Sequence, residues 1–143
     1  MANNRKMKTT FLQDKIKGKK IFSILSEPQT KQKKLVIMSH GFRGTSVGPS
    51  RTFVNFTKML VDEGFSTLRF DQPNSGNSDG DFLEVSFKEW VNTIVFLSQK
   101  YIKAGYTVAL LGQSMGATAS MIATANSTLK SKISCLMLWV PDP

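Results

Sequence analysis

A serine between two glycines, set after an apolar run and before a run of small residues, constrains this chain more than any other feature. YTVALLG, residues 106–112, has the continuous apolar pattern of a strand buried on both faces of a parallel sheet. It leads into Gly112-Gln113-Ser114-Met115-Gly116, and alanines follow at 117, 119 and 123. Glycines at both ends permit a turn too sharp for a Cβ, and the alanines let a helix lie close to the sheet. The sequence therefore predicts a strand, a tight turn with Ser114 at its apex, and a helix over 114–125; the alternative is an ordinary strand-to-helix corner.

Further apolar runs predict the other strands. FLQDKI (11–16) and KIFSIL (20–25) flank the turn-like KGK and predict an antiparallel hairpin. KLVIMSH (34–40) again has the pattern of a strand buried on both faces, and FSTLRFD (65–71) and ISCLMLWV (133–140) predict two more strands. The loop QPNSGNSDGD (72–81), which directly follows FSTLRFD, is dense in turn-forming residues.

Two amphipathic segments predict helices between these strands. Residues 48–64 have Ser50 as the expected N-cap, Gly64 as the stop, and apolar residues near helical spacing at Phe53, Phe56, Leu60 and Val61. Ser86 and Glu89 fit a capping box, in which each side chain accepts a backbone N–H of the first turn. That second helix is expected to end at Gly105 and to bury one face, formed by Trp90, Ile94, Leu97 and Tyr101.

This order of elements predicts the fold class. Parallel strands joined by helices require right-handed crossovers, and the 143 residues, 41% of them hydrophobic, suffice for one core. The chain has no internal repeat and no linker rich in Pro, Gly or Ser. We expect a single α/β domain over 1–143, a doubly wound, mostly parallel sheet with an N-terminal antiparallel hairpin.

The net charge of +9 is concentrated near the N-terminus. Residues 1–34 hold ten Lys or Arg and two acidic residues, whereas the rest of the chain is nearly balanced. Few aromatic residues accompany this charge, and no nucleic-acid motif does. We interpret the charge as the solvated face of the hairpin and its linker, with binding to nucleic acid or to an anionic surface as the alternative.

The single cysteine and the absence of targeting signals bear on location. Cys135 lies in an apolar run, so we expect a buried, unreactive thiol and no internal disulfide. The first residues have no apolar signal region, and no later stretch reaches the length of a membrane-spanning helix. These features predict a soluble, cytoplasmic protein without membrane contact.

A second glycine-containing turn follows KLVIMSH. In His40-Gly41-Phe42-Arg43-Gly44 the glycine lets the backbone turn across the end of the sheet, where the Phe42 N–H can join the Met115 N–H. Two such donors stabilise the negative oxygen that forms when a serine attacks a carbonyl group. A phosphate-binding loop is the competing interpretation of GFRGTSVG, but the lysine-containing pattern of such loops is missing. We expect His40 itself to be structural.

Taken in order, HGFRG, FDQPNSGNSDG, GQSMGA and LWVPDP resemble the α/β-hydrolase fold. They are most similar to bacterial serine esterases and serine-aminopeptidase-like hydrolases, including the cinnamoyl and feruloyl esterase type. The resemblance extends from the hairpin to Val140 and matches the N-terminal portion of such enzymes. It implies that Ser114 is the nucleophile, that Phe42 and Met115 form the oxyanion hole, and that the substrate is a small carboxylic ester or amide. It implies no cofactor, and that Asp71 shapes the sheet's edge.

The sequence departs from that family in one important respect. The only histidine, His40, precedes Ser114, whereas these hydrolases take their acid and then their histidine from segments after the nucleophile. Asp142 is the single acid after Ser114 and is a candidate catalytic acid, with an ordinary chain-end residue as the alternative. The acidic residues of the 71–84 loop match no calcium-binding spacing, so we expect no metal site.

The strand predicted over Ile133–Val140 would form an edge of the sheet if no further strand followed it. An apolar, unpaired edge favours association, so this edge is expected to meet a complementing C-terminal half or a second copy. Three interpretations remain open from the sequence: the N-terminal portion of a serine hydrolase, weak or inactive by itself; a non-catalytic binding module that keeps the carbonyl-binding pocket; and a basic, nucleic-acid-associated protein.

Overall fold

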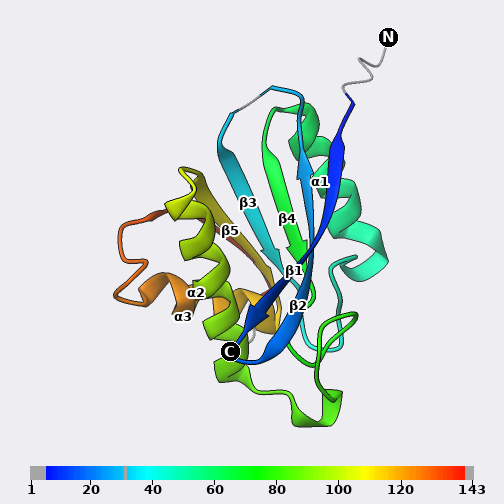
Figure 1. Cartoon of the computed structure of the whole chain (residues 1–143), viewed down its shortest axis with the longest axis vertical. Coiled ribbons are helices and arrows are strands. Elements are labelled where there is room, and N and C mark those ends of the chain that lie inside the picture. The colour runs from blue at the N-terminus through cyan, green and yellow to red at the C-terminus, as the bar shows by residue number, and fades with distance from the viewer. Residues whose placement is uncertain (1–5, 31, 141–143) are drawn as a thin grey trace.

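A six-stranded mixed sheet forms the centre of the molecule (Figure 1). The computed structural model describes residues 6–30 and 32–140. In spatial order the strands are β1 (Lys8–Ile16), β2 (Lys19–Glu27), β4 (Ser66–Phe70), β3 (Lys34–Ser39), β5 (Thr107–Gln113) and β6 (Ile133–Trp139). The pairs β1–β2 and β2–β4 are antiparallel, and the other pairs are parallel. The predicted fold class, with its N-terminal hairpin, is confirmed.

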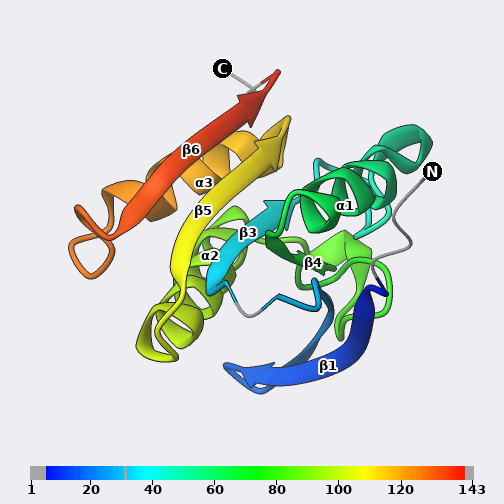
Figure 2. The same cartoon turned by 90° about the horizontal axis from the view of Figure 1, so that it is seen from above.

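Helices cover both faces of this sheet, as expected of a doubly wound fold (Figure 2). Helix α1 (Thr52–Asp62) lies on one face, while α2 (Phe87–Lys103) and α3 (Met115–Ala125) lie on the other. Two short 3-10 turns, η1 (Pro49–Arg51) and η2 (Phe82–Glu84), precede α1 and α2. Each face therefore has its own apolar core.

The larger core lies between the sheet and helices α2 and α3. It includes the predicted face of α2, all of it buried: Trp90, Ile94, Leu97 and Tyr101. The smaller core joins α1 to the sheet through Phe53, Val36, Met38 and Leu111. Each large apolar side chain removed from water in these cores contributes about 1.5–3 kcal/mol. The predicted buried face is thus confirmed for α2, whereas in α1 Phe53 and Val61 are buried and Phe56 and Leu60 are only partly buried.

The predicted N-caps of these helices are wrong in detail. Helix α1 begins at Thr52, and Ser50 lies in η1 with φ 49°, outside the extended conformation that a capping serine adopts. Ser86 is the N-cap residue of α2, but its side chain makes no capping hydrogen bond. Glu89 does not reach back to Ser86; it pairs with Lys19 of β2 at 2.9 Å. A long-range ion pair has replaced the local capping interaction.

Strand β6 lies at one edge of the sheet and, among the described residues, pairs only with β5. Cys135 on this strand is exposed, so the predicted buried thiol is wrong. The contacts of β6 with the α1 side of the core lie nearer its end, where Met137 packs against the smaller core and Trp139 contacts Phe53 and Phe56. Cys135 lies earlier on this edge strand and is exposed.

Candidate active site

Ser114 occupies the turn between β5 and α3. Its backbone has φ 54° and ψ −126°, a sparsely populated conformation for a residue with a side chain. Such a conformation costs about 1–3 kcal/mol and persists only where the surrounding structure imposes it. Here the Ser114 N–H donates to the Trp139 carbonyl oxygen at 2.8 Å, and the Ser114 carbonyl oxygen accepts from Ala117 N–H at 2.8 Å. The predicted strand, sharp turn and helix are all present.

The two glycines that flank Ser114 are required by close packing. A Cβ on Gly112 would lie 2.5 Å from the Ala117 Cα and would collide with the Gly116 carbonyl oxygen. A Cβ on Gly116 would collide with the carbonyl oxygens of Ser39 and His40. The first turn of α3 therefore packs directly on the end of β3, where the His40–Gly44 segment begins.

That segment, residues 41–44, forms a tight turn beside Ser114 and is called here the Phe42 turn. The Gly44 N–H donates to the Gly41 carbonyl oxygen at 2.9 Å, which leaves Phe42 and Arg43 at the centre of the turn, with Arg43 at φ 61°. The Gly41 N–H donates to Gln113 Oε1 at 3.1 Å, and a Cβ on Gly41 would lie 3.0 Å from the Ser114 Cβ. The structure thus brings the Phe42 turn, Ser114 and the start of α3 together.

The predicted donors of an oxyanion hole are the backbone N–H groups of Phe42 and Met115. Among the described residues, neither the Phe42 N–H nor the Met115 N–H donates a hydrogen bond to a protein acceptor. Met115 is also the first residue of α3, where a helix leaves its N–H groups without intrahelical partners and carries a partial positive charge. An oxygen that gains negative charge next to Ser114 is therefore favoured at this position.

His40 is buried behind the turn, and both of its ring nitrogens are engaged. Nε2 accepts from the Gln72 N–H at 3.0 Å, so Nδ1 carries the proton and donates to the Gly41 carbonyl oxygen at 2.8 Å. The ring packs edge-on against Trp90, with centroids 5.1 Å apart. Burial lowers the pKa of His40, although the hydrogen bond to Gly41 and the charge of Asp71 oppose that effect. His40 is a neutral structural residue in this arrangement.

Three acidic residues of the 71–84 loop, Asp71, Asp79 and Asp81, accept backbone N–H groups. Asp79 Oδ2 accepts from Lys20, and Asp81 Oδ1 accepts from Leu83. Over the residues that the structure describes, no group of three or more His, Cys, Asp or Glu side chains could hold a metal ion. Asp142, the candidate acid, lies outside the described residues.

An open groove of about 500 Å³ adjoins the Phe42 turn and is lined in part by Phe42, Arg43, Val47 and Gln113. Phe42 is 51% exposed, and its ring lies 5.2 Å from that of Phe82, measured between centroids. Gln113, Val47 and Phe82 were not predicted as site residues. Gln113 could have been found from its position beside the serine, whereas the other two come from loops whose course the sequence does not indicate.

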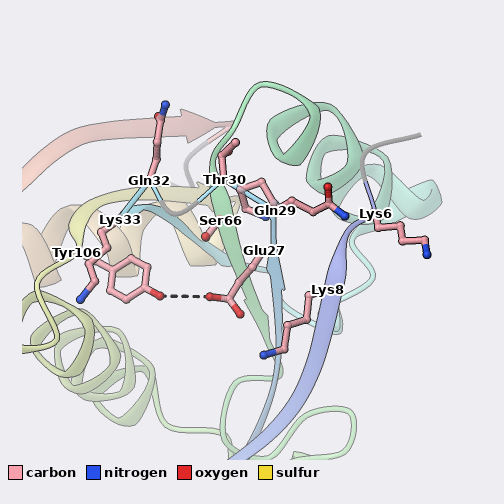
Figure 3. A pocket seen from close by; sticks show the side chains of 10 residues that line it. Lys6, Lys8, Glu27, Gln29, Thr30, Gln32, Lys33, Ser66 and Tyr106 are labelled. Carbon is pink, nitrogen blue, oxygen red and sulfur yellow. Dashed lines mark hydrogen bonds between the residues drawn. The ribbon is translucent and has the colours of Figure 1, made fainter. Parts of the chain in front are cut away.

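A separate cavity of about 430 Å³ lies at the opposite end of the sheet (Figure 3). It is lined in part by Lys33, Ser66 and Tyr106, which stand at or just before the starts of β3, β4 and β5. Figure 3 shows the hydrogen bond between the Tyr106 hydroxyl and Glu27, 3.3 Å long. Because Ser114 follows the carboxyl end of β5, this cavity takes no part in the candidate active site.

Comparison with known proteins agrees with this geometry. The sequence profile of the family described as "Serine aminopeptidase, S33" matches residues 30–141. This chain belongs to that family. No match was found among curated proteins. Within the described residues, no helix is long and apolar enough to cross a membrane.

Solved structures of esterases and related hydrolases share the fold of this family member. Est1E from Butyrivibrio proteoclasticus with ferulic acid bound has a TM-score of 0.76 and 28% identity, over 85% of this chain and 49% of that one. GrgF, an α/β hydrolase from Penicillium sp. sh18, has a TM-score of 0.76 and 17% identity, over 94% of this chain and 46% of that one. A PEG-bound, cold-adapted esterase from an Arctic intertidal metagenomic library has a TM-score of 0.69 and 17% identity, over 92% and 60%. The chain spans about half the length of the first of these structures.

Proposed function

We propose that this family member provides the nucleophile and the oxyanion hole of a serine hydrolase that cleaves a small carboxylic ester or amide. The observation that carries this proposal is the strained backbone of Ser114, held at the β5–α3 turn against the Phe42 turn. Conformations that cost about 1–3 kcal/mol cluster at functional sites, where the surrounding structure holds them. The esterase names of the structural relatives support an ester over an amide.

The reaction would proceed through an acyl-enzyme. Ser114 Oγ attacks the carbonyl carbon of the substrate, loses its proton to a base, and the carbonyl oxygen takes up the electron pair. The N–H groups of Phe42 and Met115 donate hydrogen bonds to that oxygen. Collapse of the intermediate expels the alcohol or amine, which takes a proton, and water then hydrolyses the acyl group from Ser114.

The base is the element that the described residues do not supply. His40 is the only histidine in the sequence, and both of its nitrogens are engaged away from Ser114. We therefore expect this chain alone to be a weak hydrolase. Oxyanion-hole enzymes that have lost a triad member still accelerate the reaction about 10³–10⁴-fold over water.

The engaged histidine also favours a second candidate function, a non-catalytic module that binds carbonyl compounds in the same groove. We further propose that the Ile133–Val140 edge receives another strand, from a complementing segment or a second copy. Its side chains are exposed or only half-buried, and Val140 is 81% exposed. Unpaired backbone groups on an apolar edge are a template for such pairing.

Hydrolysis of a p-nitrophenyl ester by the wild-type chain, Ser114→Ala and Ser127→Ala tests the proposed catalytic role. Ser127 is an exposed serine beyond α3, so its loss should leave the rate unchanged. We expect Ser114→Ala to lose the enzyme-dependent rate, and a fluorophosphonate to label the wild-type chain at Ser114 by intact mass. Equal hydrolysis by all three proteins, with no label, would exclude catalysis and leave the binding module.

A further inference from the structure

The segment Gly41–Gly48, called here the oxyanion loop, is held at its far end by a buried pair of opposite charges. The Ser46 N–H donates to Asp71 Oδ1 at 2.6 Å, and Arg69 Nη1 donates to the Ser46 carbonyl oxygen at 2.9 Å. Both side chains come from the end of β4, the strand beside β3. Ser46 is 4% exposed, Arg69 9% and Asp71 1%, so water does not compete for these bonds.

The second oxygen of the same carboxylate holds the following loop. Asp71 Oδ2 accepts from the Asn77 N–H at 2.8 Å, and the Asp71 carbonyl oxygen accepts from the Ser78 hydroxyl at 2.6 Å. The Asp71 carboxylate therefore joins the oxyanion loop to the loop that follows β4. Hydrogen bonds to an ionised carboxylate are shorter and stronger than those between neutral groups, which suits a fixed support.

The near end of the oxyanion loop is fixed by Gln113, whose Oε1 accepts from the Gly41 N–H. Residues 42–45 lie between this anchor and Ser46. Arg43 has φ 61°, a conformation that a side chain disfavours and that an unsupported loop would relax. The tight turn that presents the Phe42 N–H therefore lies between two anchors, the Gly41 bond to Gln113 and the Ser46 bond to Asp71.

We propose that Asp71, together with Arg69, is a positioning residue that holds the Phe42 N–H where it can donate to the developing oxyanion. This inference rests on the proposed function of Ser114. Loss of one oxyanion donor typically lowers the rate of the chemical step about 10²–10³-fold. Because Asp71 is buried behind the loop, its loss should lower that rate while affecting substrate affinity little.

The test compares the full chain with Asp71→Ala, Asp71→Asn and, as a matched control, Asp81→Ala. Asp81 is an exposed acidic residue of the same region whose side chain accepts from the nearby Leu83 N–H. Two readouts are used: amide hydrogen exchange of residues 41–48, and the rate of Ser114 labelling by a fluorophosphonate as a function of its concentration.

In Asp71→Ala we expect faster exchange confined to 41–48 and 74–80, and a maximal labelling rate lower by about 100-fold, the loss typical of one missing donor. The half-saturating probe concentration should stay close to that of the wild type. Asp71→Asn keeps an oxygen for Ser46, so it should recover part of the rate, and Asp81→Ala should match the wild type. If Asp71→Ala does not fold, Asp71→Asn decides through the same readouts.

Unchanged exchange and labelling in Asp71→Ala would overturn the proposal. So would faster exchange across the whole chain, because that result assigns Asp71 a general role in stability. A wild-type chain that is not labelled at Ser114 refutes the proposed function instead. In that case amide hydrogen exchange of residues 41–48 in Asp71→Ala still decides whether Asp71 holds the oxyanion loop.

Discussion

Mild acid should destabilise this protein through one side chain, His40. In the folded state burial lowers its pKa below the usual value of about 6.5, and the neutral ring donates to Gly41 and accepts from Gln72. In the unfolded chain the imidazole takes up a proton near pH 6.5. The unfolded state therefore binds more protons than the folded state between that pH and the lowered folded pKa. Stability is full above about pH 6.5 and falls as the pH decreases through this window.

The magnitude follows from linkage. One proton of difference changes the free energy of unfolding by about 1.36 kcal/mol for each pH unit. Between about pH 7.5 and 5.5 the loss attributable to His40 is then at most about 1.4 kcal/mol, because only the lower half of that range lies below the unfolded pKa. For a domain of this size, such a loss is a measurable part of a total near 5–15 kcal/mol.

Urea unfolding followed by circular dichroism at about pH 7.5, 6.5 and 5.5 measures the effect. The control is His40→Gln, which keeps a neutral polar side chain and removes the titrating group. Because carboxylates titrate in both proteins, the difference between their pH slopes isolates His40. Since it is the only histidine, its Cε1–H signal in an NMR titration also gives the folded pKa directly. Equal slopes in the two proteins, or a folded pKa at or above about 6.5, would refute the reasoning.

Two further predictions concern packing and association. Gly116→Ala should lower the free energy of unfolding, measured in urea, by about 3 kcal/mol, because the new Cβ meets the His40 carbonyl oxygen. The control, Met121→Ala on an exposed face of α3, should lower it far less. Similar losses in the two variants would contradict the close packing. If β6 pairs with a second copy, sedimentation velocity should show concentration-dependent dimers that Cys135→Lys weakens, since a lysine on an edge strand opposes pairing, while Ser127→Lys leaves them unchanged. A wild-type chain that stays monomeric would contradict self-association.

The elements of this fold were predictable because their signals are local. The strand before Ser114 and the buried face of α2 follow from apolar periodicity alone, and Ser114 follows from two glycines at fixed spacing. The predicted capping box was wrong for the opposite reason. Glu89 pairs with Lys19, seventy residues away in the chain, and no local sequence pattern indicates that contact. Cys135 was misjudged because apolar neighbours indicate a strand but not whether a helix covers it.

The supports of the candidate site were less predictable than its central residue. Asp71 stands between β4 and a loop dense in turn residues, where an acidic side chain is ordinary. Its bond to Ser46 joins residues 25 positions apart, and it exists only because β4 lies beside β3 in the sheet. The hydrogen bonds of His40 likewise depend on Gln72, which follows β4 and donates its N–H to His40 Nε2. The sequence therefore indicates which single residues could take part in chemistry. The order of the strands in the sheet decides which distant residues contact one another.

The strand order also affects how the protein is made. Strand β3 lies between β4 and β5, and its residues Leu35 to Ser39 are all buried in the folded protein. During synthesis β3 leaves the ribosome well before either neighbour, and Gln113, the last residue of β5, follows Ser39 by 74 positions. At about 5–20 residues per second, this apolar strand waits about 4–15 s for its second partner. A strand that is almost wholly protected from water in the finished molecule is thus open to misfolding and to chaperones while the chain is growing.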